Sequence, residues 1–217
     1  MMNWIIGRES KKEGFWWNAV GGAISSGQAA ILLVFISHQI GITVAGIVTI
    51  AYAVANLFAS VTRYGVRNYQ VTDVNRLFSF GDYFYSRLCS ALLTVIICSG
   101  YFAWCVIVNG DSVSKLIILV EITILKMIDA VEDVYLGCYQ QTGHFSAGAK
   151  IMAVRLGICT LLICLLICAG ADIYISLGIG IIVSLVLDIC FIRGTFQITH
   201  SGIGTVNAER VKELMKK

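Results

Sequence analysis

The sequence predicts an all-α, polytopic membrane protein with six transmembrane helices in a single bundle. Of its 217 residues, 58% are hydrophobic and 13% are charged, whereas a soluble domain has about 25% charged residues. Six apolar stretches are long enough to cross a bilayer, for which about 20 residues suffice. The connections between these stretches are short, so we expect no soluble catalytic domain.

The first apolar stretch, Phe15–Ser37, is too long for the apolar region of a signal peptide and has no convincing cleavage site. We therefore expect an uncleaved first span. Its Asn18 and Gln28 are expected to point inward, because polar groups avoid lipid. The second span, Ile42–Val61, carries Asn56 well inside it.

Four more spans are expected after the arginine-containing polar segment Arg63–Arg87, at Phe84–Val108, Val113–Gly137, Ile151–Ala169 and Ile173–Ile192. The chain thus divides into an N-terminal segment (1–14), the membrane bundle (15–192) and a basic tail or linker (193–217). In this tail, a short amphipathic helix on or near the membrane surface is predicted by the spacing of Val206, Val211 and Leu214.

The fourth predicted span carries five ionisable residues among its apolar ones: Glu121, Lys126, Asp129, Glu132 and Asp133. At about 100° per residue they lie within less than half of the helix circumference. A charge at the bilayer centre costs about 2.5–3.5 kcal/mol, so this face is not expected to meet hydrocarbon. We expect it to face other helices or a water-filled cavity and to line a pathway.

Two interpretations of this charged face remain open. In the structural one, Lys126 and Asp129 form a self-contained pair, and Glu132 and Asp133 emerge among the cytoplasmic head groups. In the functional one the same pair forms, but Glu132 or Asp133 gains and loses a proton as the cavity opens. Like charges in poorly solvated surroundings tend to retain one proton, so these residues are candidates for energy coupling.

A basic cluster lies at the end of the second span, where Arg63 and Arg67 accompany Tyr64, Asn68 and Gln70. The planar guanidinium group suits phosphate and diphosphate oxygens. These arginines are therefore candidate contacts for a phosphorylated lipid head group at the mouth of a cavity. The alternative is that they only set the topology and contact anionic lipid.

Enzyme signatures are absent from the sequence, so we predict no enzyme and no cofactor. It contains no phosphate-binding Gly-rich loop, no zinc-protease motif and no nucleophile elbow. The eight cysteines show no Cys-x-x-Cys pattern and no Cys/His spacing typical of metal binding. We therefore predict no metal site.

Several segments carry a resemblance to a known family: Ala45–Ile47, Ala51–Leu57, Gly65–Asp73, Asp129–Asp133 and Gly137–Gly143. The chain from Phe15 to about Arg193 resembles the polysaccharide and O-antigen flippases of the multidrug/oligosaccharidyl-lipid/polysaccharide exporter superfamily. Members of that superfamily usually have two six-helix lobes with a substrate cavity between them. The resemblance implies that this chain corresponds to the N-terminal lobe. Three alternatives stay open: a fragment of a longer protein, a truncated gene product, or a half that dimerises.

The same resemblance implies the function. A flippase of this family would move a lipid-linked oligosaccharide, a polyprenyl diphosphate sugar, across the bacterial plasma membrane for lipopolysaccharide or capsule synthesis. The substrate-binding residues would then be Arg63, Arg67, Asn56, Gln28 and Asn18. The alternatives are a multidrug or cation antiporter of the same fold, in which the acidic residues bind Na⁺ or H⁺, and a non-transporting scaffold in polysaccharide assembly. Arg63 and Arg67 favour the flippase.

The orientation follows from the distribution of basic residues, which concentrate in cytoplasmic segments. With a cytoplasmic N-terminus, the outside loops hold only Lys115, and both termini are inside. The segments counted as inside hold Arg8, Lys11, Lys12, Arg63, Arg67, Arg76, Arg87, Lys150, Arg155, Arg193, Arg210, Lys212, Lys216 and Lys217.

Labelling of single cysteines in a cysteine-free background should reproduce this topology. We expect positions in His38–Gly41 and Asn109–Ser112 to react with an impermeant thiol reagent from outside. Positions in Tyr69–Ser79 and Gln140–Ser146 should react only after permeabilisation. Labelling of position 75 from the outside would contradict the predicted orientation.

Overall fold

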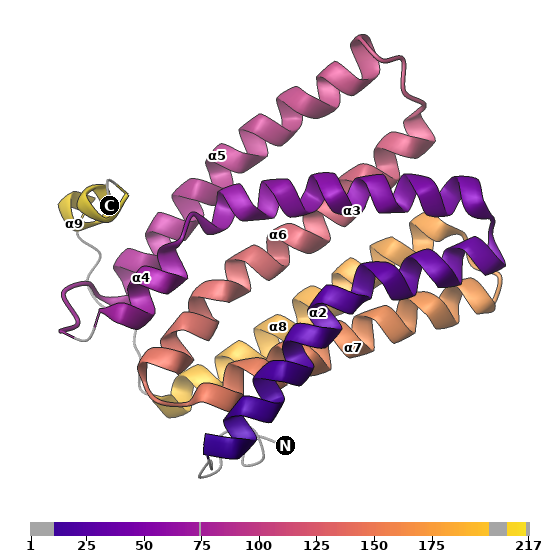
Figure 1. The fold of residues 1–217 in the computed structure, drawn as a ribbon. Coiled ribbons are helices and arrows are strands. Elements are labelled where there is room, and N and C mark those ends of the chain that lie inside the picture. Colours follow the sequence, from indigo (N-terminus) through magenta and orange to yellow (C-terminus); the bar gives the residue numbers. More distant parts are fainter. Residues whose placement is uncertain (1–10, 74, 200–207, 216–217) are drawn as a thin grey trace.

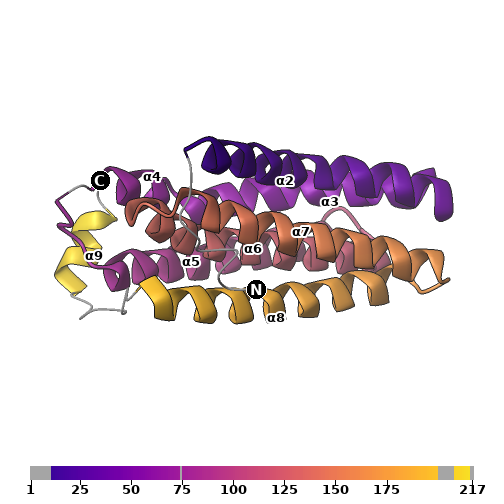
Figure 2. The same cartoon turned by 90° about the horizontal axis from the view of Figure 1, so that it is seen from below.

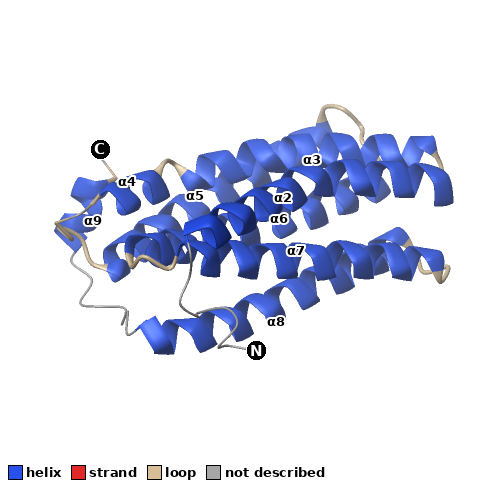
Figure 3. Cartoon of the chain, turned by 60° about the horizontal axis from the view of Figure 1, so that its bottom comes forward, coloured by secondary structure: helices blue, strands red, loops and turns tan. Residues whose placement is uncertain are grey.

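The computed structural model describes residues 11–73, 75–199 and 208–215, and all regular structure in these residues is helical (Figure 3). The six long helices are α2 (Lys11–Gln39), α3 (Ile42–Arg63), α5 (Phe80–Ile107), α6 (Val113–Gln141), α7 (Phe145–Cys168) and α8 (Ile173–Thr199). The two short helices are α4 (Val66–Thr72) and α9 (Ala208–Leu214).

Five helices of the described chain are long and apolar enough to cross a membrane: α2, α3, α5, α7 and α8. The protein is therefore an all-α, multi-pass membrane protein with five candidate spans. Helix α6, which corresponds to the predicted fourth span, has 29 residues. It is not among the five candidates, so the predicted six-span lobe is not confirmed.

Helix α6 runs through the middle of the bundle (Figure 1, Figure 2). It packs most extensively against α3 and also contacts α4, α5, α7 and α8. Helix α2 packs along α7 and α3, and α7 packs along α8. The most highly charged of the long helices is thus enclosed by apolar neighbours.

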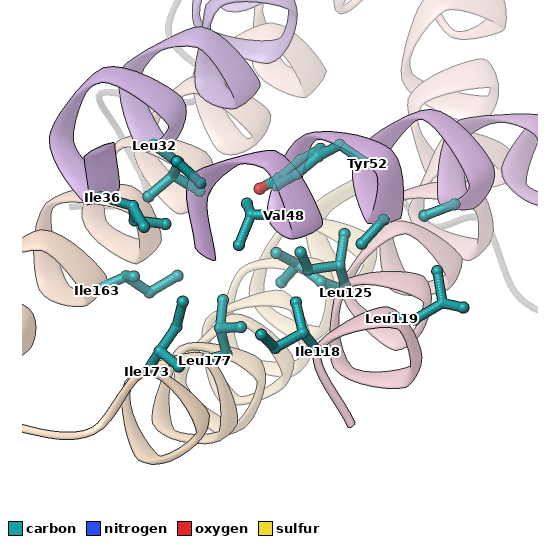
Figure 4. Packing of buried hydrophobic residues seen from close by; sticks show 14 of the residues in the cluster. Leu32, Ile36, Val48, Tyr52, Ile118, Leu119, Leu125, Ile163, Ile173 and Leu177 are labelled. Atoms are coloured by element: carbon teal, nitrogen blue, oxygen red, sulfur yellow. The ribbon is translucent and has the colours of Figure 1, made fainter. Parts of the chain in front are cut away.

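The main apolar cluster occupies the half of the bundle that contains the α2–α3 and α7–α8 turns, which we call the apolar half. Figure 4 shows side chains from α2, α3, α6, α7 and α8 meeting there, among them Leu32, Tyr52, Leu125, Ile163 and Leu177. We call the other half, which contains α4 and α9, the basic half. Polar side chains concentrate in the basic half.

The α3–α4 turn positions two of the predicted site residues. Tyr64 and Gly65 have left-handed backbone conformations, with φ values of 37° and 66°. Glycine adopts such a conformation without steric cost, so the chain turns sharply between Arg63 and Arg67. Both arginines consequently reach one cavity.

Several helices extend beyond the predicted spans, and two of these differences change the interpretation. Helix α5 begins at Phe80 rather than Phe84, because Ser79 and Asp82 form a capping box. Helix α7 begins at Phe145 rather than Ile151, so most of the predicted polar connection 138–150 is helical. Lys150, which we had assigned to a cytoplasmic segment, is buried with its Nζ 5.8 Å from the ring centroid of Trp17.

The predicted amphipathic tail helix is present as α9, but it packs on the protein. It contacts α5, and its Val211 and Leu214 are buried. Leu214 joins a cluster with Val66, Phe78, Tyr83 and Val134. Its apolar face is thus covered by the protein itself, while its placement on or near the membrane surface stays a prediction. Val206 lies outside the described residues.

Helices α6 and α7 approach closely at Gly148, and this contact is testable. A Cβ atom at Gly148 would lie 2.8 Å from Leu136 Cδ2, whereas a Cβ atom at Gly157 on the same helix would meet nothing within 4 Å. Overpacking typically costs about 1–3 kcal/mol. We expect Gly148→Val to lower the melting temperature in detergent by several degrees and Gly157→Val to leave it nearly unchanged. Equal effects would contradict the packing.

Candidate functional site

A polar cavity of about 260 Å³ lies in the basic half, between α2, the α3–α4 turn, α6 and α7. In Figure 1 the first turns of α2 and helix α4 diverge on either side of the C-terminal part of α6. The cavity wall includes Ser25 and Ser26 from α2. Its charged lining residues are Arg63, Arg67, Asp129, Glu132, Asp133 and Arg155. The structure thus brings the predicted basic cluster and most of the predicted acidic face together.

Arg155 is the centre of a buried ionic cluster. Its Nη2 donates hydrogen bonds to Asp129 Oδ1, at 2.7 Å, and to Glu132 Oε2. Its Nη1 donates to Ser184 Oγ at 2.7 Å. Its Nε lies 3.0 Å from Asp188 Oδ1, an ion pair without hydrogen-bond geometry. One fully buried guanidinium group on α7 therefore connects carboxylates from α6 and α8.

The predicted Lys126–Asp129 pair is confirmed, with 3.0 Å between Nζ and Oδ2. The pair is not self-contained, since Asp129 also binds Arg155. Lys126 Nζ donates to Gln28 Oε1 at 3.0 Å and lies 5.2 Å from the ring centroid of Tyr52. The expectation that Gln28 points inward is also confirmed, because its side chain is buried.

Asp133 accepts hydrogen bonds from two arginines. Arg67 Nη1 lies 2.9 Å from Oδ1, and Arg87 Nη2 lies 3.0 Å from Oδ2. Arg87 is fully buried and also donates to the backbone oxygen of Thr62 at 2.6 Å. The expectation that Glu132 and Asp133 emerge among head groups is therefore wrong, because both are buried and paired. Asp133 is thus held by two arginines, and Glu132 is held by Arg155.

Arg63 lines the same cavity but has no anionic partner among the described residues. Its buried Nε has no hydrogen-bond acceptor in that part of the chain. The ionic network as a whole has five cations, Arg63, Arg67, Arg87, Lys126 and Arg155, and four carboxylates, Asp129, Glu132, Asp133 and Asp188. The formal excess is one positive charge, and the unpaired cation is Arg63.

Five predicted site residues do not line the cavity: Asn18, Gln28, Asn56, Glu121 and Lys126. Asn18 is exposed, and its amide donates to the backbone oxygens of Gly14 and Phe145 at 2.7 and 3.0 Å. Asn56 is exposed because it follows Ala55, which occupies the buried face of α3. The expected inward orientation of Asn18 was wrong, since an exposed amide can be satisfied by nearby backbone groups. Asn56 as a cavity residue is not supported by its position.

Glu121 shares a helical stripe with Glu132, as predicted, but not its surroundings. The two residues are three helical turns apart, or about 16 Å along the axis, and the polar cavity does not extend that far. Glu121 is half-buried near Gly178 of α8, and its Oε2 has no hydrogen-bond partner among the described residues. Its role as a cavity residue is therefore not supported.

Arg87, Arg155 and Asp188 belong to the site but are not among the residues predicted from the sequence. The distribution of basic residues places Arg87 and Arg155 in cytoplasmic segments, whereas both are fully buried in the bundle. The rule applied to the fourth span, that an ionisable residue in an apolar segment faces the interior, would have identified Arg155 and Asp188. The positive-inside rule, which predicts the orientation, does not distinguish an arginine in a loop from a buried arginine.

No protein-family model matches this chain, and no significant similarity to a curated protein or a solved structure was found. The class is therefore defined by the fold alone: a multi-pass, all-helical membrane protein with a buried ionic network beside a polar cavity. Within residues 11–73, 75–199 and 208–215, no group of three or more His, Cys, Asp and Glu side chains is arranged to hold a metal ion.

Arg155→Gln should destabilise the protein strongly, because it leaves three carboxylates without their guanidinium partner. Removing one member of a buried ion pair costs about 3–5 kcal/mol, so we expect a large loss of folded protein in detergent. Arg67→Gln is the matched control. The Arg67 side chain is 30% exposed, and Asp133 retains Arg87, so we expect a loss of about 1 kcal/mol or less. Similar yields and melting temperatures for both variants would contradict this hierarchy.

Proposed function

We propose that this chain is one six-helix lobe of a membrane flippase that moves a lipid-linked oligosaccharide, a polyprenyl diphosphate sugar, across the bacterial plasma membrane. The single observation that supports the proposal most is the unpaired Arg63 beside Arg67 in a polar cavity. A diphosphate provides the anionic oxygens that such a guanidinium group lacks.

In this proposal α6, the fourth long helix along the chain, also crosses the membrane and brings the number of spans to six. Its Asp129, Glu132 and Asp133 are compensated within the bundle by Arg67, Arg87 and Arg155, so these three carboxylates do not meet the lipid. Its exposed positions include Ile117 and Ile124, which are apolar. A helix with a paired polar interior and an apolar exterior satisfies the requirements of a bilayer despite its composition.

The cavity is large enough for the diphosphate end of the substrate but not for the whole lipid-linked oligosaccharide. Small-molecule pockets typically measure about 300–1,000 Å³, and this one measures about 260 Å³. It fits a diphosphate and the first sugar, with the hydroxyl groups of Ser25 and Ser26 as hydrogen-bonding partners on α2. The remaining sugars would occupy space completed by a second lobe or by a second copy of this chain.

The basic half faces the cytoplasm in this proposal, because the positive-inside rule places short basic segments there. Arg63, Arg67, Arg76 and Arg193 all belong to that half, whereas Lys115 lies at the other end of the bundle, near the start of α6. A lipid-linked precursor made in the cytoplasm would then meet the cavity from the side on which it is synthesised.

Replacing Arg63 should weaken substrate binding more than it affects folding. Charge-assisted hydrogen bonds contribute about 1.5–3 kcal/mol, so we expect Arg63→Gln to weaken binding of a fluorescent polyprenyl diphosphate sugar by about tenfold or more. Arg67→Gln should have a smaller effect, because Arg67 shares its charge with Asp133. Arg76→Gln is the control, since Arg76 is exposed in the segment after α4 and does not line the cavity.

Binding to the purified chain in nanodiscs, followed by translocation in vesicles, separates the possible functions. Binding that is insensitive to Arg63→Gln would exclude the proposed diphosphate site. If the chain binds the lipid-linked sugar but does not translocate it, even when two copies are linked in one chain, a scaffold in polysaccharide assembly would be favoured. Uptake of an organic cation without any affinity for the diphosphate would favour an antiporter.

A further inference from the structure

A second hollow of about 700 Å³ lies between α5, α6 and α8. Helices α5 and α8 both pack against α6 but form no extensive contact with each other, and Figure 1 shows α6 between them. The hollow is therefore a groove whose floor is α6 and whose walls are α5 and α8. Glu132 borders both this groove and the polar cavity.

The groove is long, narrow and mostly apolar. It extends along α6 from Val120 to Tyr135, or about 22 Å at 1.5 Å per residue. Its rims carry exposed aliphatic side chains such as Ile124 and Ile189, which are 43% and 50% exposed. Its length and its mostly apolar lining suit a hydrocarbon chain.

One end of the groove is charged. Glu132, Asp188 and Arg193 line it there, in the basic half of the bundle. Asp188 keeps 9% of its side chain exposed, while its Oδ1 is buried, lies 3.0 Å from Arg155 Nε and has no hydrogen-bond donor among the described residues. Glu132 Oε1 likewise has no donor in that part of the chain. Arg193 is exposed.

The charges at this end are arranged for a zwitterion. The two carboxylates that line it, Glu132 and Asp188, share one guanidinium partner, Arg155, so the local formal excess is one negative charge. Arg193 adds a separate positive charge at the mouth of the groove. A head group with an N–H-bearing cation next to a phosphate complements both features.

From this complementarity we propose that the α5–α6–α8 groove binds a phosphatidylethanolamine molecule. One acyl chain lies along α6, the phosphate contacts Arg193, and the ammonium group donates to Asp188. A trimethylammonium head group has no N–H to donate, and phosphatidylglycerol has no cation. The groove therefore distinguishes these lipids by head group. This inference does not depend on the proposed transport of a lipid-linked sugar.

Native mass spectrometry of the full chain tests the proposal with ethanolamine, choline and glycerol phospholipids that carry the same acyl chains. We expect one phosphatidylethanolamine molecule to be retained about tenfold more tightly than phosphatidylcholine, as expected for one charge-assisted hydrogen bond. Asp188→Asn should remove this preference. Arg193→Gln should weaken the retention of all three lipids.

A second pair of variants tests the groove independently of the buried charges. Ser99→Trp places an indole in the groove from α5 and should remove the bound lipid. Ile96→Trp is the matched control, because Ile96 is 69% exposed on the same helix and does not line the groove. Equal retention of ethanolamine and choline lipids would overturn the proposal. The proposal would also be overturned if Ser99→Trp left lipid retention unchanged. A dimer of the chain that Ser99→Trp dissociates would overturn it as well.

Discussion

The position of the charged helix depends on the guanidinium group of Arg155. It is buried on α7 and bonded to two carboxylates of α6, with a third carboxylate from α8 at its Nε. An ionised carboxylate without such a partner would cost several kcal/mol in a poorly solvated interior. The packing of α6 among apolar helices follows from this compensation, because apolar contacts alone would not hold four acidic side chains inside the bundle.

The same compensation divides the bundle into two functional surfaces. On one side of α6, Arg67 and Arg87 balance Asp133, and Arg63 remains unpaired beside a polar cavity. On the other side, an apolar groove ends at Asp188 and Arg193. Glu132 lies between the two and borders both.

The fold class and the inward orientation of the charged face could be predicted from the sequence, because hydropathy and helical periodicity depend on neighbouring residues. The pairing of Lys126 with Asp129 was predictable for the same reason. The partners Arg87, Arg155 and Asp188 come from other helices, and the sequence does not specify the rotation of one helix against another. Asn18 and Asn56 show that a polar residue in an apolar segment does not always point inward. The Asn18 amide is satisfied by a nearby backbone oxygen, and Asn56 follows Ala55, which occupies the buried face of α3.

The central claim is that the acidic face of α6 is an internal ionic network held by Arg155. A double-mutant cycle between Arg155→Gln and Glu132→Gln measures this interaction most directly, with the free energy of unfolding in detergent as the readout. Residues in one buried network show interaction energies of about 0.5–3 kcal/mol. We predict that the double variant loses less unfolding free energy than the two single variants lose together. The difference should lie in the upper part of this range. Strictly additive losses would show that the two side chains do not interact and would contradict the account.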